Sequence, residues 1–463
     1  MSESGNAGDR APEVGVRVTV DVRVGVEGAA PTADAQVEPA APQSPLAPVS
    51  DSERVHEIDV VRGFALLGIL LMNIEWYTRP FVELFLGLDR SMAALDYAAG
   101  WTVMTLVQGK FYTLFSMLFG MGFAIQAERA AAKGARFGRL FARRMLGLAL
   151  IGAAHGYLVW SGDILLVYSI VGSALVLLFR KTPISRLPKW AAAFILLVGL
   201  APWGWVASQK AGLDDPERAV AASERQATQL AEFRRQAEEA REAYAHGTWI
   251  EQVPIRAREM ASQLSFLPVF GWNVLGMFLL GAWLVRSGVM RRPAEHRVFF
   301  RRALRVGLVV GLPLAVAAME LGAADGMTRM EWSLAVGASL MLVASFALCF
   351  AYLSGFVLWT QRPGWSARLR PVAQAGRMAL TNYLAQSLVA TTLFNSWGFG
   401  LYGQVSRAAQ MPLTLAIWLL NMGFSVWWLG RYRFGPAEWL WRSITYGRAQ
   451  PMRRPAAAVP RPA

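Results

Sequence analysis

The chain has 463 residues and a formal net charge of +14, with 54% hydrophobic and only 17% charged residues. Its apolar residues form blocks of about 17 to 30, which as helices match the thickness of a bilayer's hydrocarbon core. This composition excludes ordinary soluble domains. Because the basic residues lie between the apolar blocks, it also favours membrane lipids over nucleic acid as partners.

The single cysteine, Cys349, lies inside an apolar block, which excludes an intrachain disulfide and a thiolate metal site. The sequence has no phosphate-binding loop, zinc spacing or nucleotide fingerprint. We therefore expect no metal and no bound cofactor, with acyl-CoA conceivable only as a co-substrate.

Residues 1–52 are rich in Ala, Pro, Val and Glu and contain no aromatic residue. Such a segment cannot bury enough apolar surface to offset the entropy lost on ordering. It also lacks the basic start and apolar core of a secretory signal. We expect a disordered cytoplasmic tail followed by an uncleaved first membrane helix.

The blocks predict an all-α, polytopic transmembrane bundle of about ten helices, five within residues 53–208 and five within 263–430. The blocks are Val60–Trp76, Tyr97–Ala127, Leu140–Trp160, Ile164–Phe179, Trp190–Ser208, Phe266–Val285, Val306–Leu321, Trp332–Trp359, Met378–Trp397 and Leu413–Leu429.

The number of Lys and Arg residues alternates between high and low in successive segments between the apolar blocks, and this pattern predicts the orientation in the membrane. The segments after the second, fourth, sixth, eighth and tenth blocks each carry four or more, whereas those after the first, third, seventh and ninth together carry four. Short cytoplasmic loops are enriched in Lys and Arg, so both termini of this multi-pass membrane protein are expected in the cytoplasm.

Two polar segments flank the second group of blocks. Residues 209–262 are rich in Ala, Glu, Gln and Arg, which predicts an external helical loop serving as a spacer, as a cap or as a substrate lid. Residues 431–463 combine Arg with aromatic residues, and Pro436 is typical of a helix start. A cytoplasmic interfacial helix with a basic tail is expected there.

Ionisable side chains inside apolar blocks are costly and are therefore candidate site residues. His155 lies five residues before Trp160, and a tight turn at residues 161–162 should return the chain so that Asp163 and Tyr168 lie near it. An imidazole beside a carboxylate and a phenol can act as a general base that deprotonates a hydroxyl or amine. The alternative is a buried histidine joining two helices, with Asp163 capping the second.

The remaining candidates form two groups, one near each side of the bilayer. Glu75 and Lys110 should lie toward the outer face, where they form an ion pair or where Lys110 reaches the head groups. Arg62 should lie near the inner face in a local pair with Asp59.

The ninth block adds three further inner candidates. Asn382 and Gln386 share one helix face and either join helices or line an inner vestibule. Arg377, at the start of the same block, is available to an anionic donor from the cytoplasm.

Three stretches resemble the YeiB-like family of bacterial inner-membrane proteins, a family of unknown function. They are Arg54 with residues 58–74, including Met72-Asn73-Ile74; residues 162–172; and residues 376–387 with 434–447. The opening Asp-x-x-Arg-Gly stretch also resembles membrane acyltransferases of the heparan glucosaminide acetyltransferase type. Those enzymes carry a catalytic histidine after the first helix, whereas residues 77–96 contain none, so His155 would have to take that role.

The acyltransferase resemblance implies transfer of an acyl group from a cytoplasmic thioester to an envelope glycan or lipid. A transporter or flippase for an envelope metabolite or lipid-linked sugar is the alternative. In either case the partners are membrane lipids and a small-molecule or lipid-linked substrate. Substrate-binding roles then fall to Arg62, Asn73, Glu75, Lys110, Arg377, Asn382 and Gln386, while the oligomeric state stays open.

Overall fold

The computed structural model describes residues 55–134, 137–211, 215–323 and 331–454, so the tail expected at 1–52 lies outside the described residues. Apart from an isolated bridge between Tyr432 and Arg453, the described residues form helices, turns and loops without a strand. The all-α prediction is confirmed. The long helices in chain order are α1 (His56–Thr78), α2 (Ala94–Leu106), α3 (Lys110–Ala132), α4 (Phe137–Leu158), α5 (Leu165–Phe179), α6 (Leu187–Lys210), α7 (Pro216–His246), α8 (Gln252–Ser265), α9 (Leu267–Arg286), α10 (Arg297–Ala318), α11 (Trp332–Thr360), α13 (Arg370–Arg377), α14 (Ala379–Phe394), α15 (Arg407–Arg431) and α16 (Pro436–Tyr446).

Among the described residues, five helical segments are long and apolar enough to cross a membrane. They are Ile184–Lys210, Leu267–Arg286, Arg297–Gly322, Trp332–Thr360 and Arg407–Arg431. The other apolar blocks also form helices, namely α1, α3, α4, α5 and α14. A membrane protein built from apolar helices follows, while ten crossings and the location of both termini stay predictions.

The second apolar block is broken, contrary to the single helix predicted for Tyr97–Ala127. It forms α2 and α3, separated by a turn that ends at Gly109 with φ +80°. This left-handed backbone conformation cannot continue a right-handed helix and favours glycine. A Cβ on Gly109 would also lie 2.7 Å from the Ser345 hydroxyl of α11.

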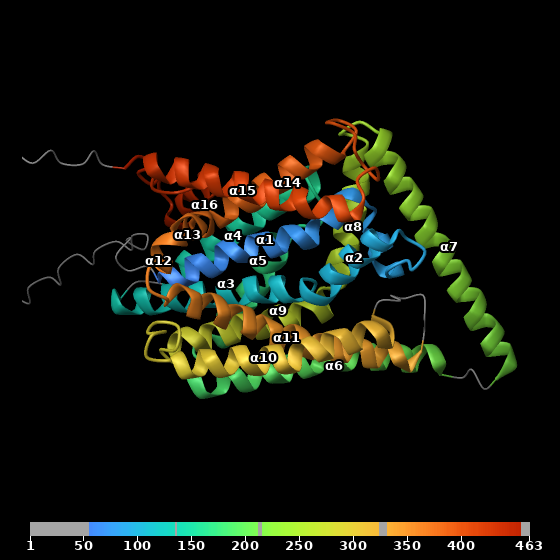
Figure 1. Ribbon diagram of the computed structural model, residues 1–463, viewed down its shortest axis with the longest axis horizontal. Coiled ribbons are helices and arrows are strands. Elements are labelled where there is room, and N and C mark those ends of the chain that lie inside the picture. Colours follow the sequence, from blue (N-terminus) through green and yellow to red (C-terminus); the bar gives the residue numbers. More distant parts are fainter. Residues whose placement is uncertain (1–54, 135–136, 212–214, 324–330, 455–463) are drawn as a thin grey trace, which may run out of the picture. The chain divides into compact units, whose positions relative to one another are not determined.

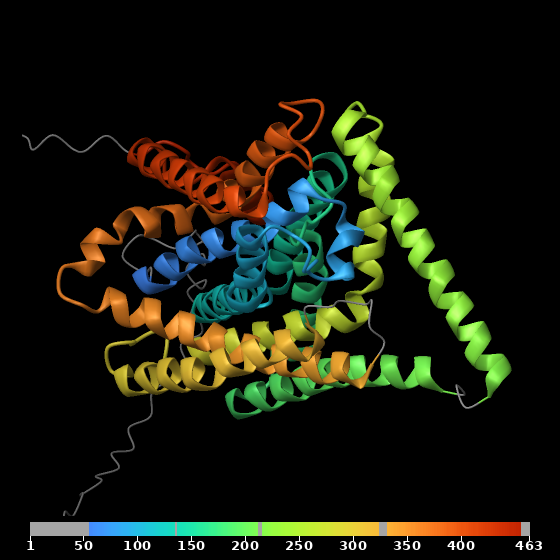
Figure 2. The same ribbon diagram turned by 45° about the vertical axis from the view of Figure 1, so that its right-hand side comes forward.

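Helix α1 is central to the bundle and contacts α3, α11, α13, α14 and α15 (Figure 1). Its approach to α13 is very close, since a Cβ on Gly376 would lie 1.9 Å from the Asp59 carbonyl oxygen and one on Gly63 would lie 2.1 Å from that of Val372. Glycine at both positions lets the two backbones touch. Figure 2 shows α6, α10 and α11 side by side as a second group, in keeping with the contacts of α11 with both α6 and α10.

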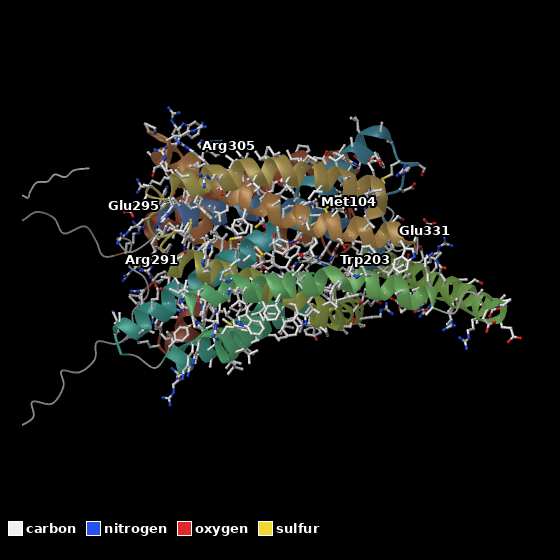
Figure 3. The ribbon with its side chains drawn as sticks, turned by 90° about the horizontal axis from the view of Figure 1, so that it is seen from below. Met104, Trp203, Arg291, Glu295, Arg305 and Glu331 are labelled. Atoms are coloured by element: carbon white, nitrogen blue, oxygen red, sulfur yellow. The ribbon has the colours of Figure 1, made fainter. Side chains whose placement is uncertain are left out.

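The bundle has two ends, at which different helices begin, finish and lie. At one end, here the α16 end, α1 and α14 begin and α13 and α16 lie; at the other, the α7 end, α1 finishes and α2, α7 and α8 lie (Figure 1). Figure 3 shows the same division on another face, with Arg291, Glu295 and Arg305 at the end opposite Trp203 and Glu331.

Candidate active site

A buried pair of His155 and Asp163 joins α4 to the start of α5. The His155 Nδ1 and Asp163 Oδ2 atoms are 2.7 Å apart, and both side chains are almost fully buried. The other carboxylate oxygen, Oδ1, accepts a hydrogen bond from the Leu166 amide at 2.8 Å, which caps α5. Asp163 therefore both contacts His155 and accepts a hydrogen bond from the first turn of α5, while a catalytic role of the pair stays a prediction.

A glycine allows this pair to form. A Cβ on Gly152 of α4 would lie 2.5 Å from the Leu166 amide nitrogen and 2.9 Å from Asp163 Oδ1. The two helices can thus approach only because α4 has no side chain at this point.

The other imidazole nitrogen of His155, Nε2, makes no hydrogen bond within the described residues. A carboxylate only accepts hydrogen bonds, so Nδ1 carries the proton and Nε2 is left as an acceptor. Nε2 is also buried. The rings of Tyr383 and Trp160 lie beside the imidazole, with centroids 5.2 and 6.2 Å away. This is the arrangement expected of an oriented general base.

Tyr168 contacts other partners than the sequence suggested. Its hydroxyl lies 2.7 Å from that of Ser116 and donates to the Tyr112 carbonyl at 3.2 Å. The tyrosine ring that packs against His155 is instead that of Tyr383 of α14, more than 200 residues away in sequence.

Helix α8 fixes the turn between His155 and Asp163. Ser161 donates to Glu259 at 2.5 Å, and Tyr244 of α7 donates to the same carboxylate at 2.7 Å. With its amide nitrogen turned toward the turn, Gln263 donates to the carbonyls of Ser161 and Asp163. Burial raises the pKa of the Glu259 carboxyl, and the hydrogen bonds from Ser161 and Tyr244 partly oppose that shift.

One cavity, here the basic cavity, has a volume of about 220 Å³ and extends toward the α16 end. Its polar lining there consists of Asp59, Arg62, Arg144, Arg377, Glu438 and Arg442. Arg62 pairs with Asp59 at 2.9 Å, as expected from the sequence. The arginines outnumber the carboxylates, so this end suits an anionic group such as a phosphate.

The second cavity, here the apolar cavity, has a volume of about 500 Å³ and shares Ile69, Ile164, Tyr168 and Tyr383 with the basic cavity. The shared residues lie between the two cavities, at what is here called their junction, and one of them, Tyr383, is the residue whose ring contacts His155. Arg62 precedes Ile69 by two turns of α1, or about 10 Å. His155 and Asp163 line neither cavity themselves; the pair lies behind Tyr383, whose ring contacts His155, and Ile69 beside it is about that far along α1 from Arg62.

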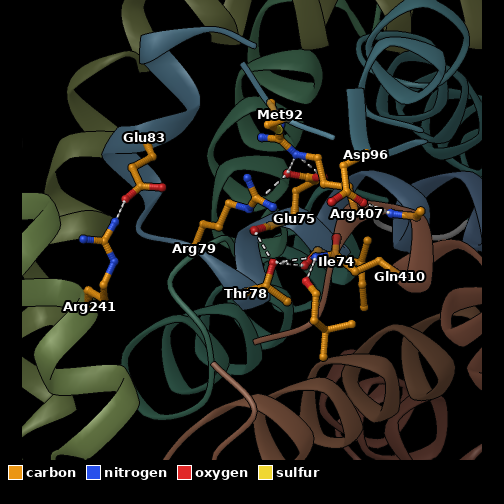
Figure 4. A network of polar contacts seen from close by, with 12 residues as sticks. Ile74, Glu75, Thr78, Arg79, Glu83, Met92, Asp96, Arg241, Arg407 and Gln410 are labelled. Atoms are coloured by element: carbon orange, nitrogen blue, oxygen red, sulfur yellow. Dashed lines mark hydrogen bonds and ion pairs between the residues drawn. The ribbon is translucent and has the colours of Figure 1, made fainter. Parts of the chain in front are cut away.

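The third cavity, here the α7 cavity, has a volume of about 780 Å³ and shares Met72, Trp76, Met104 and Gln108 with the apolar cavity. Its charged residues come from the bundle and from α7 (Figure 4). Arg407 Nε donates to both Glu75 oxygens at 2.9 Å, and Arg79 pairs with the same carboxylate at 3.6 Å. Arg241 of α7 pairs with Glu83. Charges of both signs therefore line this cavity.

Glu75 and Lys110 do not form the pair considered from the sequence. The ion pairs of Glu75 are with Arg407 and Arg79, whereas the Lys110 ammonium donates to the Met104 carbonyl at 3.2 Å and contacts the Met341 sulfur at 3.1 Å. Lys110 is completely buried, so it does not extend to the head groups either.

The inner candidates separate into two kinds. Arg62 and Arg377 line the basic cavity. Asn382 instead donates to the Ala375 carbonyl and to the Ser425 hydroxyl of α15, so it joins helices. Asn73 lines the apolar cavity, and the buried Gln386 Nε2 has no hydrogen-bond partner in the described ranges.

Three residues of the site were missed from the sequence: Tyr383, Glu259 and Arg407. Tyr383 lies in the same run as Asn382, but nothing local brings it to His155. Glu259 lies in a segment interpreted as a spacer, cap or lid. Arg407 is the single basic residue between the ninth and tenth apolar blocks. A lone arginine in a loop expected at the outer face could have been predicted to pair with a carboxylate there, such as Glu75.

Helix α16, near the carboxyl terminus, contributes a carboxylate to the lining of the basic cavity. Glu438 of α16 accepts hydrogen bonds from the Leu380 amide at 2.7 Å, the Thr381 amide at 3.1 Å and the Thr381 hydroxyl at 2.5 Å. It thereby caps α14, which carries Tyr383. Burial raises the pKa of the Glu438 carboxyl, while the hydrogen bonds from Thr381 act in the opposite direction.

Comparison with known proteins relates the chain to bacterial proteins without an assigned function. A family model described as "Protein of unknown function (DUF418)" matches residues 284–448. The uncharacterized protein YxaH of Bacillus subtilis is 33% identical over 88% of this chain and 98% of its own length. The uncharacterized protein YeiB of Escherichia coli is 33% identical over 86% of this chain and 98% of its own length. No solved structure matches the chain.

Proposed function

Since the chain belongs to the YeiB-like family of proteins of unknown function (DUF418), we propose a function from the chain's own site: acyl transfer across a membrane. The acyl group would come from a cytoplasmic thioester and pass to a glycan or lipid acceptor of the envelope. The observation that carries this proposal is the His155–Asp163 pair beside the junction of the basic and apolar cavities.

The basic cavity is the proposed site for the donor's anionic carrier. Arg144, Arg377 and Arg442 line it together with the Asp59–Arg62 pair. Guanidinium groups bind phosphates through several hydrogen bonds at once. A thioester such as acyl-CoA, bound by its phosphates at this end, would extend its reacting carbonyl toward Tyr168 and Tyr383.

The proposed reaction needs a base but no metal or redox group. The acceptor hydroxyl attacks the thioester carbonyl carbon while His155 Nε2 takes its proton, and Asp163 stabilises the imidazolium through Nδ1. The carbon–sulfur bond then breaks as the tetrahedral intermediate collapses. The imidazolium returns its proton to the leaving thiolate, so that the products are an ester and a free thiol.

The proposed orientation places the α16 end in the cytoplasm of a bacterial inner membrane. The basic loops after the even-numbered apolar blocks support this orientation through the positive-inside pattern. A cytoplasmic thioester would then meet the basic cavity, and an envelope acceptor would enter from the α7 end.

The direct test is thioester binding and turnover by the purified full-length protein in lipid nanodiscs. We expect radiolabelled acyl-CoA to bind wild type and to be hydrolysed slowly in the absence of acceptor. His155→Ala should lower turnover about a hundredfold or more, because general-base catalysis contributes at least that much, while binding persists. His246→Ala, which changes an exposed histidine on α7, should match wild type. Absence of acyl-CoA binding by the wild-type protein would refute the proposal.

A transporter or flippase is the second candidate, favoured by one observation. The basic cavity shares lining residues with the apolar cavity, and the apolar cavity shares others with the α7 cavity. The three cavities therefore form a row from the α16 end to the α7 end. Flux of a radiolabelled sugar or lipid-linked sugar into proteoliposomes, abolished in Glu75→Gln, would favour transport. Acyl transfer instead predicts no flux and a chemically changed acceptor.

A further inference from the structure

We propose that the apolar cavity binds the hydrocarbon chain of the transferred acyl group, and therefore that the donor carries a chain of several carbons rather than acetyl. This inference rests on the proposed acyl transfer and specifies its substrate.

The lining of the apolar cavity is suited to a flexible chain. Four methionines from different elements line it, together with leucine and aromatic side chains. They are Met72, Met104, Met319 and Met341. Methionine side chains are flexible and polarisable, and they adapt to hydrocarbon of varying shape.

The order of the cavities fits a single extended thioester. The basic cavity lies on one side of Tyr168 and Tyr383 and the apolar cavity on the other. A donor whose phosphates contact the arginines and whose carbonyl lies beside His155 has only the apolar cavity ahead of its acyl carbons.

The size of the apolar cavity argues against acetyl. Its volume of about 500 Å³ is many times the roughly 10–15 Å³ that a site for one water molecule needs on the same measure, and an acetyl group adds only two carbons. A cavity of this size and lining is typical of a ligand site.

The test compares thioesters that differ only in chain length. Acetyl-, butanoyl-, octanoyl- and dodecanoyl-CoA are titrated against the full-length protein in nanodiscs, and their affinity and hydrolysis are measured. We expect octanoyl-CoA to bind about tenfold or more tightly than acetyl-CoA, because each buried methylene adds to binding.

Two variants on α11 change the cavity in opposite directions. Ala338→Phe should fill part of it and shift the preference at least about tenfold toward shorter chains, whereas Leu342→Ala should enlarge it and shift the preference toward dodecanoyl-CoA. Val343→Phe, at an exposed position on the same helix, is the matched control and should leave the chain-length profile as in wild type. Because Leu342→Ala only removes atoms, it keeps the inference testable if Ala338→Phe does not fold.

Each result decides a different point. A flat profile, or a preference for acetyl-CoA that neither variant shifts, overturns the chain inference while leaving acyl transfer intact. A bilayer lipid in the cavity, detected by native mass spectrometry and not displaced by octanoyl-CoA, also overturns it. Failure of every thioester to bind refutes acyl transfer itself and the chain inference with it.

Discussion

At the residue scale, one carboxylate determines what His155 can do. Asp163 accepts from the His155 Nδ1 with one oxygen and from the Leu166 amide with the other. The first contact sets the tautomer and directs the lone pair to Nε2; the second fixes the carboxylate at the start of α5. The Asp163 side chain thus serves both the proposed chemistry, through His155, and the fold, through the Leu166 amide. Replacing its carboxylate by an amide can separate the two.

Asp163→Asn is expected to lose activity while keeping the fold. The amide oxygen can still accept from Leu166, but an amide NH₂ facing Nδ1 makes that nitrogen the acceptor and puts the proton on Nε2. Thioester turnover should fall about a hundredfold or more, with a melting temperature close to wild type. Turnover at the wild-type rate, measured on a sample that melts normally, would contradict the base assigned to His155.

Glu259 gives a prediction about pH, because burial raises the pKa of its carboxyl above 4.5. The folded protein then binds this proton more tightly than the unfolded chain. The resulting stability is complete below about pH 4.5 and is lost as the pH rises through the raised pKa. Its charged or titratable neighbours include Arg258, which favours the ionised form, Tyr244, which donates to the carboxylate, and Arg256 and Tyr402, which interact with it electrostatically.

Glu259→Gln should remove this pH dependence. Melting temperatures in detergent, measured from pH 4 to 8 in about one-unit steps, should decline less for the variant than for wild type as the pH rises. Glu224→Gln, an exposed substitution on α7, serves as the control and should follow the wild-type curve. Identical slopes for wild type and Glu259→Gln would show that this carboxyl is not linked to folding.

At the scale of elements, the hairpin of α4 and α5 depends on the close approach at Gly152. Because the nearest atom to an added Cβ is a backbone nitrogen, relief requires the helices to separate rather than a side chain to rotate. Gly152→Ala should therefore destabilise the protein by about 1–3 kcal/mol and displace Asp163 from His155. Thermal unfolding and thioester turnover measure the two effects.

Gly138→Ala on the same helix is the matched control for Gly152→Ala. The nearest atom to its Cβ is an Arg180 guanidinium nitrogen at 3.9 Å, an ordinary contact. Alanine is the better helix former, so this variant should melt at the wild-type temperature or slightly above. A Gly152→Ala protein that behaves like Gly138→Ala would mean that the hairpin can accommodate the extra methyl group.

The helices were largely predictable and their pairing was not. Hydropathy is local, so the block Leu140–Trp160 coincides closely with α4, and the tight turn after it placed Asp163 beside His155. The break at Gly109 was missed because both flanks are apolar and only the backbone conformation distinguishes them. The contacts of His155 with Tyr383 and of Glu75 with Arg407 join residues more than 200 positions apart, which no local pattern encodes.

At the scale of the whole molecule, every proposed role depends on which end faces the cytoplasm. The basic cavity lies toward the α16 end and the mixed-charge α7 cavity toward the other. An inverted protein would offer its arginine-rich cavity to the envelope, where soluble thioesters are not supplied. Orientation is therefore a test of the donor assignment that needs no assay of activity.

The single buried cysteine makes that test simple. In a Cys349→Ala background, Ser223→Cys reports from an exposed position on α7 and Ser366→Cys from an exposed position at the opposite end, on α12 (Trp365–Arg368). With both termini inside, an impermeant maleimide added to intact bacterial spheroplasts should label Ser223→Cys almost completely and Ser366→Cys only after lysis. Labelling of both sites before lysis would indicate leaky cells, and the release of a cytoplasmic marker enzyme detects such leakage. The reverse pattern would place the arginines of the basic cavity outside and exclude a cytoplasmic acyl donor.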